Sequence, residues 1–293
     1  MENSDIGFAF IFITILIGLF YFFYIVGVSR TNSDYVTKQH NLMIKNGEID
    51  DLKLNQGEFP FDVYVINLER DKDRWENVQN EMKKVGITNY HRWDAIDGKK
   101  IDNSDLYKYG ITQSLIDKQG KGIASCAASH VSLLKHISDN NLGWTLILED
   151  DIHFHPKFKS LFSKYWNETP TNSIIVYPGY DDRKINFSKN DIVFSFGTYC
   201  AHSYMVNSYG ARYLLQLLNK IEMAIDEELV KHFDNLSNVN KSFCFNGDIP
   251  ISYEDDNNTI DIIPHDYKRK NGDKCLFSGL IYQNRKEMKS NLR

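Results

Sequence analysis

Several common signatures are missing from this sequence of 293 residues. It contains no G-x-G-x-x-G element and no G-x-x-x-x-G-K-[ST] loop, so neither a Rossmann dinucleotide site nor a Walker-type phosphate loop is indicated. Its four cysteines include no C-x-x-C pair, which argues against a structural zinc site. Whether they form two disulfides or stay free thiols is open. The formal net charge of -5 lacks the positive excess of a general nucleic-acid binder, so we expect no nucleic-acid partner.

The composition is otherwise that of an ordinary globular protein. Hydrophobic residues make up 42% of the chain and charged residues 25%, which is enough apolar material for a sizeable core. The length allows one large domain or two small ones, and the chain shows no internal repeat.

One long apolar run lies near the start of the sequence. Residues 6–28 contain no charged residue and are almost all Ile, Leu, Phe, Val, Tyr or Gly. A helix of this length spans the roughly 30 Å of bilayer hydrocarbon. The run is too long for the apolar region of a usual signal peptide, and the acids Glu2 and Asp5 precede it instead of basic residues. We expect one retained transmembrane helix, which would make this a single-pass membrane protein.

The side of the membrane on which the rest of the chain lies stays open. Arg30 and Lys38 follow the run, and the positive-inside rule then mildly favours a cytoplasmic carboxyl-terminal side. Residues 29–60 are polar with little periodicity, which is typical of a stem or linker. The globular domain is expected over residues 61–285.

Strand and helix patterns alternate through the globular part. Short apolar runs predict strands, and apolar residues at helical spacing, such as Val78, Met82 and Val85, predict helices. This alternation predicts an α/β fold with a mostly parallel central sheet and helices on its faces. Strands are expected at 61–68, 90–96, 145–148, 174–177, 201–206 and 260–263, and helices at 69–85, 124–137 and 209–218.

The most informative segment joins a buried strand to three carboxylates. The apolar residues 144–148 run directly into Glu149, Asp150 and Asp151. Three adjacent carboxylates repel one another unless a cation lies among them, and hard oxygen ligands suit a divalent ion. The carboxyl ends of strands are also where open α/β sheets bind their ligands. The alternative is a solvated acidic turn after a strand.

Other candidate residues are weaker when each is taken alone. The turn at residues 67–74 follows the first strand, so its backbone N–H groups, together with Arg70 and Arg74, could bind a diphosphate. A charged, solvated first helical turn is the alternative. His130 lies on a predicted helix among small residues, where a buried structural histidine is the default interpretation.

Two further candidates lie in the second half of the chain. Asp226 begins an acidic stretch, residues 226–228, that precedes apolar helical residues. It is either an acidic first helical turn or a general base. His265 follows a predicted strand and is either a surface residue or a late metal ligand.

Taken in order, these segments resemble glycosyltransferase family 25, which contains bacterial lipooligosaccharide glycosyltransferases and collagen galactosyltransferases. The resemblance runs from about Val63 to about Tyr267. Two positions depart from the family pattern, since Ile123 and Ser125 stand where the family has Glu and Gly. The matching segments are Val65–Arg74, Ala95–Gly98, Gly122–His130, Glu149–Asp151, Tyr204–Arg212, Ile225–Leu229 and Pro264–His265.

The resemblance implies a GT-A-like, Rossmann-type nucleotide-sugar transferase domain. It implies a UDP-sugar donor, Mn²⁺ or Mg²⁺ as the cofactor, and an inverting transfer in which Asp226 is the catalytic base. The metal ligands would be Glu149, Asp151 and His265, with Asp151 in direct contact. The donor-binding residues would be Asn67, Leu68, Arg70, Arg74, Asp97, Gly98, Ser129 and His130.

Three hypotheses about function follow. The leading one is a metal-dependent glycosyltransferase that moves a hexose, galactose or glucose, from a UDP-sugar to a hydroxyl acceptor on a glycan, lipooligosaccharide or collagen-like protein. The second is a catalytically inactive, membrane-anchored binding protein of the same fold, motivated by the departures at Ile123 and Ser125. The third is a metal-dependent hydrolase, although the chain lacks a His-rich or second acidic cluster.

Overall fold

The computed structural model describes residues 53–169, 173–181, 192–194, 200–233, 242–245, 251–254, 260–263 and 277–283. The predicted membrane anchor at residues 6–28 and the candidate ligand His265 lie outside these ranges. Within the ranges, no helix is long and apolar enough to cross a bilayer.

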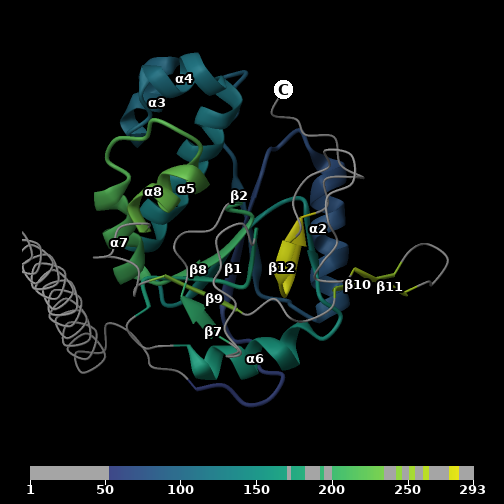
Figure 1. Ribbon diagram of the computed structural model, residues 1–293. Helices are drawn as coiled ribbons and strands as arrows, with labels where there is room; N and C mark the ends of the chain where they lie inside the picture. Colours follow the sequence, from purple (N-terminus) through teal and green to yellow (C-terminus); the bar gives the residue numbers. More distant parts are fainter. Residues whose placement is uncertain are drawn as a thin grey trace, which may run out of the picture.

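A seven-stranded sheet forms the centre of the fold (Figure 1), in the order β2-β1-β3-β8-β5-β9-β7. Five of its strands run in one direction, while β8 and β7 run against their neighbours. The prediction of an α/β fold with a mostly parallel sheet is therefore confirmed, but the reversal of β8 between β3 and β5 was not predicted. The strands are β1 Asp62–Asn67, β2 Tyr90–Asp94, β3 Thr145–Glu149, β5 Ile175–Tyr177, β7 Ile192–Phe194, β8 Ser203–Val206 and β9 Ser242–Phe245.

Helices cover both faces of this sheet. On one face the core includes Ile147 of β3 together with residues of α5, α7 and α8. On the other face it includes Leu146 and Leu148 of β3 together with residues of α2 and α6. Successive side chains of β3 thus enter opposite cores, as the pleat of a strand requires. The helices are α2 Lys72–Val85, α3 Asn103–Leu106, η1 Tyr107–Tyr109 (a 3-10 turn), α4 Gln113–Gln119, α5 Lys121–Asp139, α6 Phe158–Glu168, α7 Ser208–Leu217 and α8 Ile225–Phe233.

In the described part of the chain, three two-stranded pairs lie outside the main sheet. Two of them, β4 with β13 and β6 with β12, join the end of the described chain to its middle. Leu280, between β12 and β13, is fully buried in the α2–α6 core. The strands are β4 Ile152–Phe154, β6 Gly179–Asp181, β10 Ile251–Glu254, β11 Ile260–Ile263, β12 Phe277–Gly279 and β13 Ile281–Gln283.

Residues 53–60, the last part of the expected linker, pack against α6. The side-chain amide of Asn167 accepts a hydrogen bond from the Leu54 N–H and donates one to the Leu54 carbonyl, each at 2.8 Å. The Phe59 ring lies 4.9 Å from that of Phe162, centroid to centroid. This part of the chain is therefore attached to the globular domain.

The start of α7 leaves no room for a side chain at Gly210. A Cβ atom built there would lie 2.3 Å from the carbonyl oxygen of Ile174, and the Gly210 N–H donates to the capping side chain of Asn207 at 2.8 Å. We expect Gly210→Ala to destabilise the protein by about 1–3 kcal/mol, as overpacking does. If there were no clash, the substitution would stabilise α7, because alanine has a higher helix propensity than glycine.

Gly143→Ala is the matched control, because a Cβ atom there meets no other heavy atom within 4 Å. Urea unfolding of both variants provides the measurement. Equal stability of the two variants would show that the close approach at Gly210 has no energetic consequence.

Candidate active site

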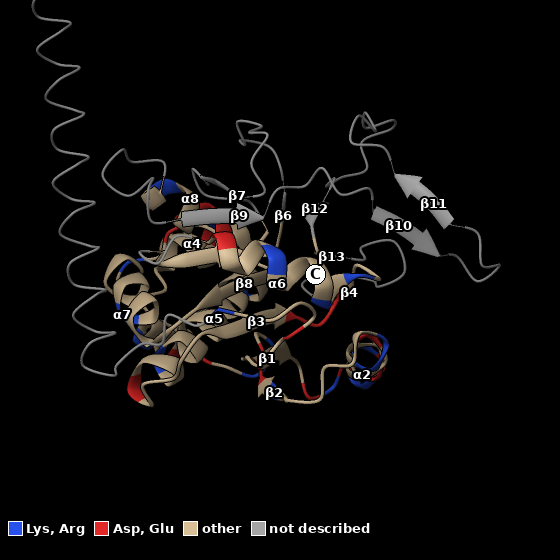
Figure 2. Cartoon of the chain, turned by 90° about the horizontal axis from the view of Figure 1, so that it is seen from below, with Lys and Arg blue, Asp and Glu red and all other residues tan. Residues whose placement is uncertain are grey.

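The candidate residues gather where β1 and β3 end. These strands are parallel neighbours, with Ile66 aligned to Glu149, so their carboxyl ends meet at one edge of the sheet. Asn67 is the last residue of β1, and Glu149 is the last residue of β3. Figure 2 shows acidic residues along the turn from β3 to β4 at this edge. This is the edge at which open α/β sheets bind ligands.

Asp150 is held by the last residue of β1 and by the first turn of α2. Its carboxylate accepts a hydrogen bond from the Asn67 amide at 2.8 Å and forms a close ion pair with Arg74 of α2. The guanidinium of Arg74 also lies 3.9 Å from the carboxylate of Asp151. Burial raises the pKa of Asp150, and the charge of Arg74 opposes that rise. Arg74 therefore supplies part of the positive charge that the three carboxylates require.

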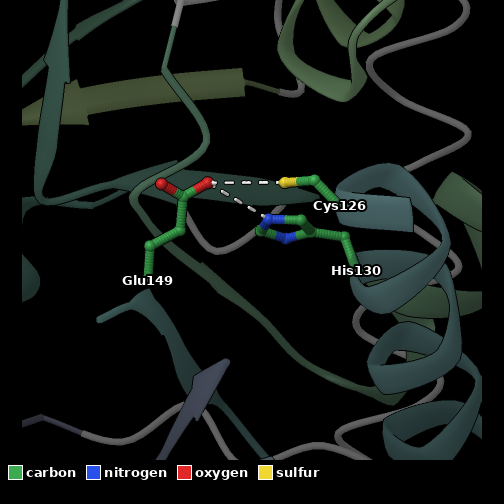
Figure 3. Close-up of side chains that lie close together, drawn as sticks. All are labelled: Cys126, His130 and Glu149. Atoms are coloured by element: carbon green, nitrogen blue, oxygen red, sulfur yellow. Dashed lines mark hydrogen bonds and ion pairs between the residues drawn. The ribbon is translucent and has the colours of Figure 1, made fainter. Parts of the chain in front are cut away.

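Glu149 turns to the opposite side of β3, toward α5 (Figure 3). One of its carboxylate oxygens, Oε1, lies 3.5 Å from Nε2 of His130 and 4.0 Å from Sγ of Cys126. The other ring nitrogen of His130, Nδ1, is 3.0 Å from the hydroxyl of Tyr204. The acidic triplet is thus divided, with Glu149 against α5 and Asp150 against α2.

The segment after β2 forms one wall of the same edge. Asp97 forms a close ion pair with Arg70, whose hydrogen bond holds the pKa of Asp97 below its ordinary value. A Cβ atom at Gly98 would lie 2.9 Å from the Lys121 carbonyl oxygen, so glycine lets this loop approach the first turn of α5. The expected donor-binding residues Arg70, Asp97 and Gly98 are therefore brought together.

Two other predicted donor-binding residues make hydrogen bonds within the fold. Leu68 lies in the turn before α2, and its carbonyl accepts a hydrogen bond from the Asp71 N–H at 2.9 Å. Ser129 is buried; its hydroxyl accepts a hydrogen bond from the Ile96 N–H at 2.8 Å and donates to the Ser125 carbonyl at 2.7 Å. The Ser129 hydroxyl therefore attaches the loop that leads to Asp97 to α5.

Asp226, in the first turn of α8, is held by two backbone donors. Its carboxylate accepts hydrogen bonds from the N–H of Cys200 at 2.8 Å and from that of Glu227 at 3.0 Å. Burial raises the pKa of Asp226, and the nearby charge of Glu149 raises it further, against the effect of the two hydrogen bonds. A fixed carboxylate with a raised pKa is suited to accept a proton.

Cys200 and Cys126 belong to this site but were not among the predicted site residues. Cys200 has a φ of 70°, a left-handed backbone conformation that is rare for residues other than glycine and is often found at functional sites. Nothing in the local sequence indicates that conformation. Cys126 could have been found, because it stands four residues before His130 on a predicted helix.

Comparisons with known proteins find a matching family model and several relatives. A family model described as Glycosyltransferase family 25 (LPS biosynthesis protein) matches residues 61–229, a range that includes every site residue described above.

Three relatives show the range of similar proteins. The chain is 29% identical over 156 residues to an inferred glycosyltransferase of Acanthamoeba polyphaga mimivirus, covering 52% of this chain and 46% of that protein. It is 25% identical over 191 residues to procollagen galactosyltransferase 1-A of Xenopus laevis, covering 59% and 31%. It is also 25% identical over 196 residues to probable inactive glycosyltransferase 25 family member 3 of Bos taurus, covering 60% and 32%. The chain therefore spans less than half the length of each relative.

Proposed function

Because the chain belongs to glycosyltransferase family 25, we propose that it transfers a hexose, galactose or glucose, from a UDP-sugar to a hydroxyl group of a glycan, a lipooligosaccharide or a collagen-like protein. The observation that carries the proposal is the convergence of carboxylates at one edge of the sheet. Glu149 is the last residue of β3, Asp151 lies in the turn that follows it, and Asp226 comes from α8. The hydrogen bonds bring the two segments together: the Asp226 carboxylate accepts the Cys200 N–H at 2.8 Å, and the carbonyl of His202, two residues further on, accepts the Glu149 N–H at 3.0 Å.

A divalent cation, Mn²⁺ or Mg²⁺, fits the chemistry of these side chains. Carboxylate oxygens are the ligands that both ions prefer, and a cation would relieve the repulsion between Glu149 and Asp226. Asp151 is the proposed direct ligand, with Glu149 and His265 as the other candidates from the sequence. When bound, such an ion would neutralise charge on a diphosphate leaving group.

The donor diphosphate is proposed to lie beside the turn between β1 and α2. Arg70 and Arg74 place two guanidinium groups there, each already paired with a carboxylate. These pairs would hold the arginine side chains in place before the donor binds. GT-A-like binding of the uridine along Asn67, Leu68, Asp97 and Gly98 completes the proposed donor site.

Asp226 is proposed to take the proton of the acceptor hydroxyl as that oxygen attacks the sugar. The two backbone hydrogen bonds fix the direction of its carboxylate, and its raised pKa favours proton transfer. One displacement with one base gives inversion at the sugar carbon.

A screen of UDP-sugars tests this proposal. Thermal shifts in the presence of Mn²⁺ identify the donor, and product analysis with glycan, lipid-linked and collagen-like acceptors identifies the reaction. Transfer to an acceptor supports the proposal. Release of free sugar alone would indicate a hydrolase, and donor binding without turnover would indicate the inactive binding protein suggested by Ile123, Ser125 and the Bos taurus relative.

We also propose that residues 6–28 anchor the protein in a membrane and take no part in the chemistry. A chain that starts at Asp51 lacks the proposed anchor. It should be soluble without a membrane and keep the turnover of the full chain. Transfer assays on both forms provide the comparison. A folded but inactive shortened chain would show that the omitted segment has a role in the reaction.

A further inference from the structure

We infer that Cys126, His130 and Glu149 form a binding site for a borderline divalent metal ion such as Zn²⁺, separate from the donor's cation. The sulfur, nitrogen and oxygen ligand atoms of these residues all lie within 4.8 Å of one another. The inference does not depend on the proposed transferase activity.

The backbone presents the three side chains in a suitable arrangement. Cys126 and His130 are four residues apart on α5, so both project from the same face of the helix (Figure 3). Zinc bonds of about 2.0 Å to nitrogen and oxygen and about 2.3 Å to sulfur place the ligand atoms of a tetrahedral site with one sulfur roughly 3.3–3.5 Å apart. The carboxylate oxygen of Glu149 is 3.5 Å from the His130 nitrogen and 4.0 Å from the sulfur. Small side-chain movements would close the site.

The imidazole of His130 provides the second, independent observation. The side chain is fully buried, and Nε2, the nitrogen that faces Glu149, makes no hydrogen bond among the described residues. A buried nitrogen without a hydrogen bond destabilises the folded state. Metal-bound histidines almost always bond through their other nitrogen to a fixed partner, and here Nδ1 lies 3.0 Å from the Tyr204 hydroxyl.

The charges also favour a divalent ion. A thiolate from Cys126, the carboxylate of Glu149 and a neutral His130 would sum to zero with one M²⁺ ion. Before an ion binds, burial and the nearby carboxylates of Glu149 and Asp226 keep the thiol protonated by raising the pKa of Cys126. Binding of the ion releases that proton to solvent.

The chemical types of the ligands select the ion. Thiolate and imidazole favour Zn²⁺, whereas Mn²⁺ and Mg²⁺ prefer sites made of oxygen ligands alone. Glu149 would then bind the borderline ion, which leaves Asp151 for the cation of the donor. An ion held in this way would fasten α5 to the end of β3 and fix the Glu149 carboxylate near Asp226.

Metal titration of the chelator-treated full chain tests the inference. We expect one equivalent of Zn²⁺ or Co²⁺ per chain, a rise in melting temperature, and a near-ultraviolet charge-transfer band from thiolate to Co²⁺. Cys126→Ser should abolish the band and weaken binding by more than about 100-fold, since changes around metal ligands already cost 10–100-fold. Cys244→Ser is the matched control, because β9 is separated from β3 by β8 and β5.

Glu149→Gln keeps the shape of the side chain and serves as a second variant in case Cys126→Ser fails to fold. Glu149→Gln should keep the thiolate-to-Co²⁺ band and weaken the binding of the metal ion. Circular dichroism establishes folding in each case. A Co²⁺ complex without a thiolate band, or zinc content that is the same in wild type and Cys126→Ser, would overturn the inference.

Discussion

Asp226→Asn should lower turnover by about 10²–10⁴-fold, the usual contribution of a general base, while the affinity for the UDP-sugar changes little. Asparagine keeps the shape of the side chain but cannot accept the acceptor's proton. The carboxylate is half-buried, its charge interacts with that of Glu149, and the N–H groups of Cys200 and Glu227 fix its position. Its removal should therefore act on the transition state and not on donor binding.

The pH dependence of the wild-type enzyme provides a second measurement of the same residue. Because the pKa of Asp226 is raised in the folded protein, the active, deprotonated form is lost at a higher pH than for an ordinary aspartate, whose pKa is about 3.9. The rate should thus fall as the pH drops through the raised pKa. Asp226→Asn should lack this acid limb.

Glu227→Gln is the matched control for Asp226→Asn. Glu227 is the next residue on α8, and its carboxylate accepts a hydrogen bond from Gln119 at 3.0 Å. We expect this variant to keep its turnover. Asp226→Asn also loses an acceptor for a backbone N–H, which costs about 1–3 kcal/mol of stability. Normal turnover with a lowered melting temperature in Asp226→Asn would show that Asp226 is only structural.

Asp151→Asn should weaken metal-dependent donor binding by about 100-fold or more, while the fold persists. The substitution removes one charged ligand with almost no change in volume, and loss of a ligand should cost more than the 10–100-fold typical of residues around a metal site. Isothermal titration with a UDP-sugar, with and without Mn²⁺, measures the effect. Asp139→Asn, in an exposed ion pair with Lys135 on α5, is the control for general loss of charge. An unchanged response to Mn²⁺ in Asp151→Asn would remove Asp151 from the metal site.

Most of the architecture near the site could be predicted from the sequence. The apolar run before Glu149 predicted β3, and the helical spacing of small and apolar residues predicted α5, which begins three residues earlier than expected, at Lys121. Its start follows Gly120, whose positive φ of 88° ends α4. The helical spacing of apolar residues predicts that a helix forms, but it does not show where a backbone turn allows that helix to begin.

The directions of the three acidic side chains could not be predicted in the same way. Glu149 and Asp151, two residues apart, were expected to act together at the end of the strand. However, β3 ends at Glu149, so Asp151 lies in a turn where strand alternation no longer applies. Arg74 was predicted to bind phosphate but not to pair with Asp150, because that contact joins residues 76 positions apart.

The reversed strand β8 is a further feature that local pattern could not show. Its residues 203–206 are all buried, as a strand inside a sheet requires, and a continuous buried run has the same appearance in either direction. The reversal matters for the site, since it places Tyr204 beside His130 and sets Cys200, before β8, against Asp226.

The most direct test of the account is the mass of an acceptor after incubation with a UDP-hexose, Mn²⁺ and the full chain. We predict that the acceptor gains one hexose for each UDP released, and that Asp226→Asn forms this product about 10²–10⁴-fold more slowly. UDP release with no glycosylated acceptor, or a donor that binds without any turnover, would contradict the assignment of this site to glycosyl transfer.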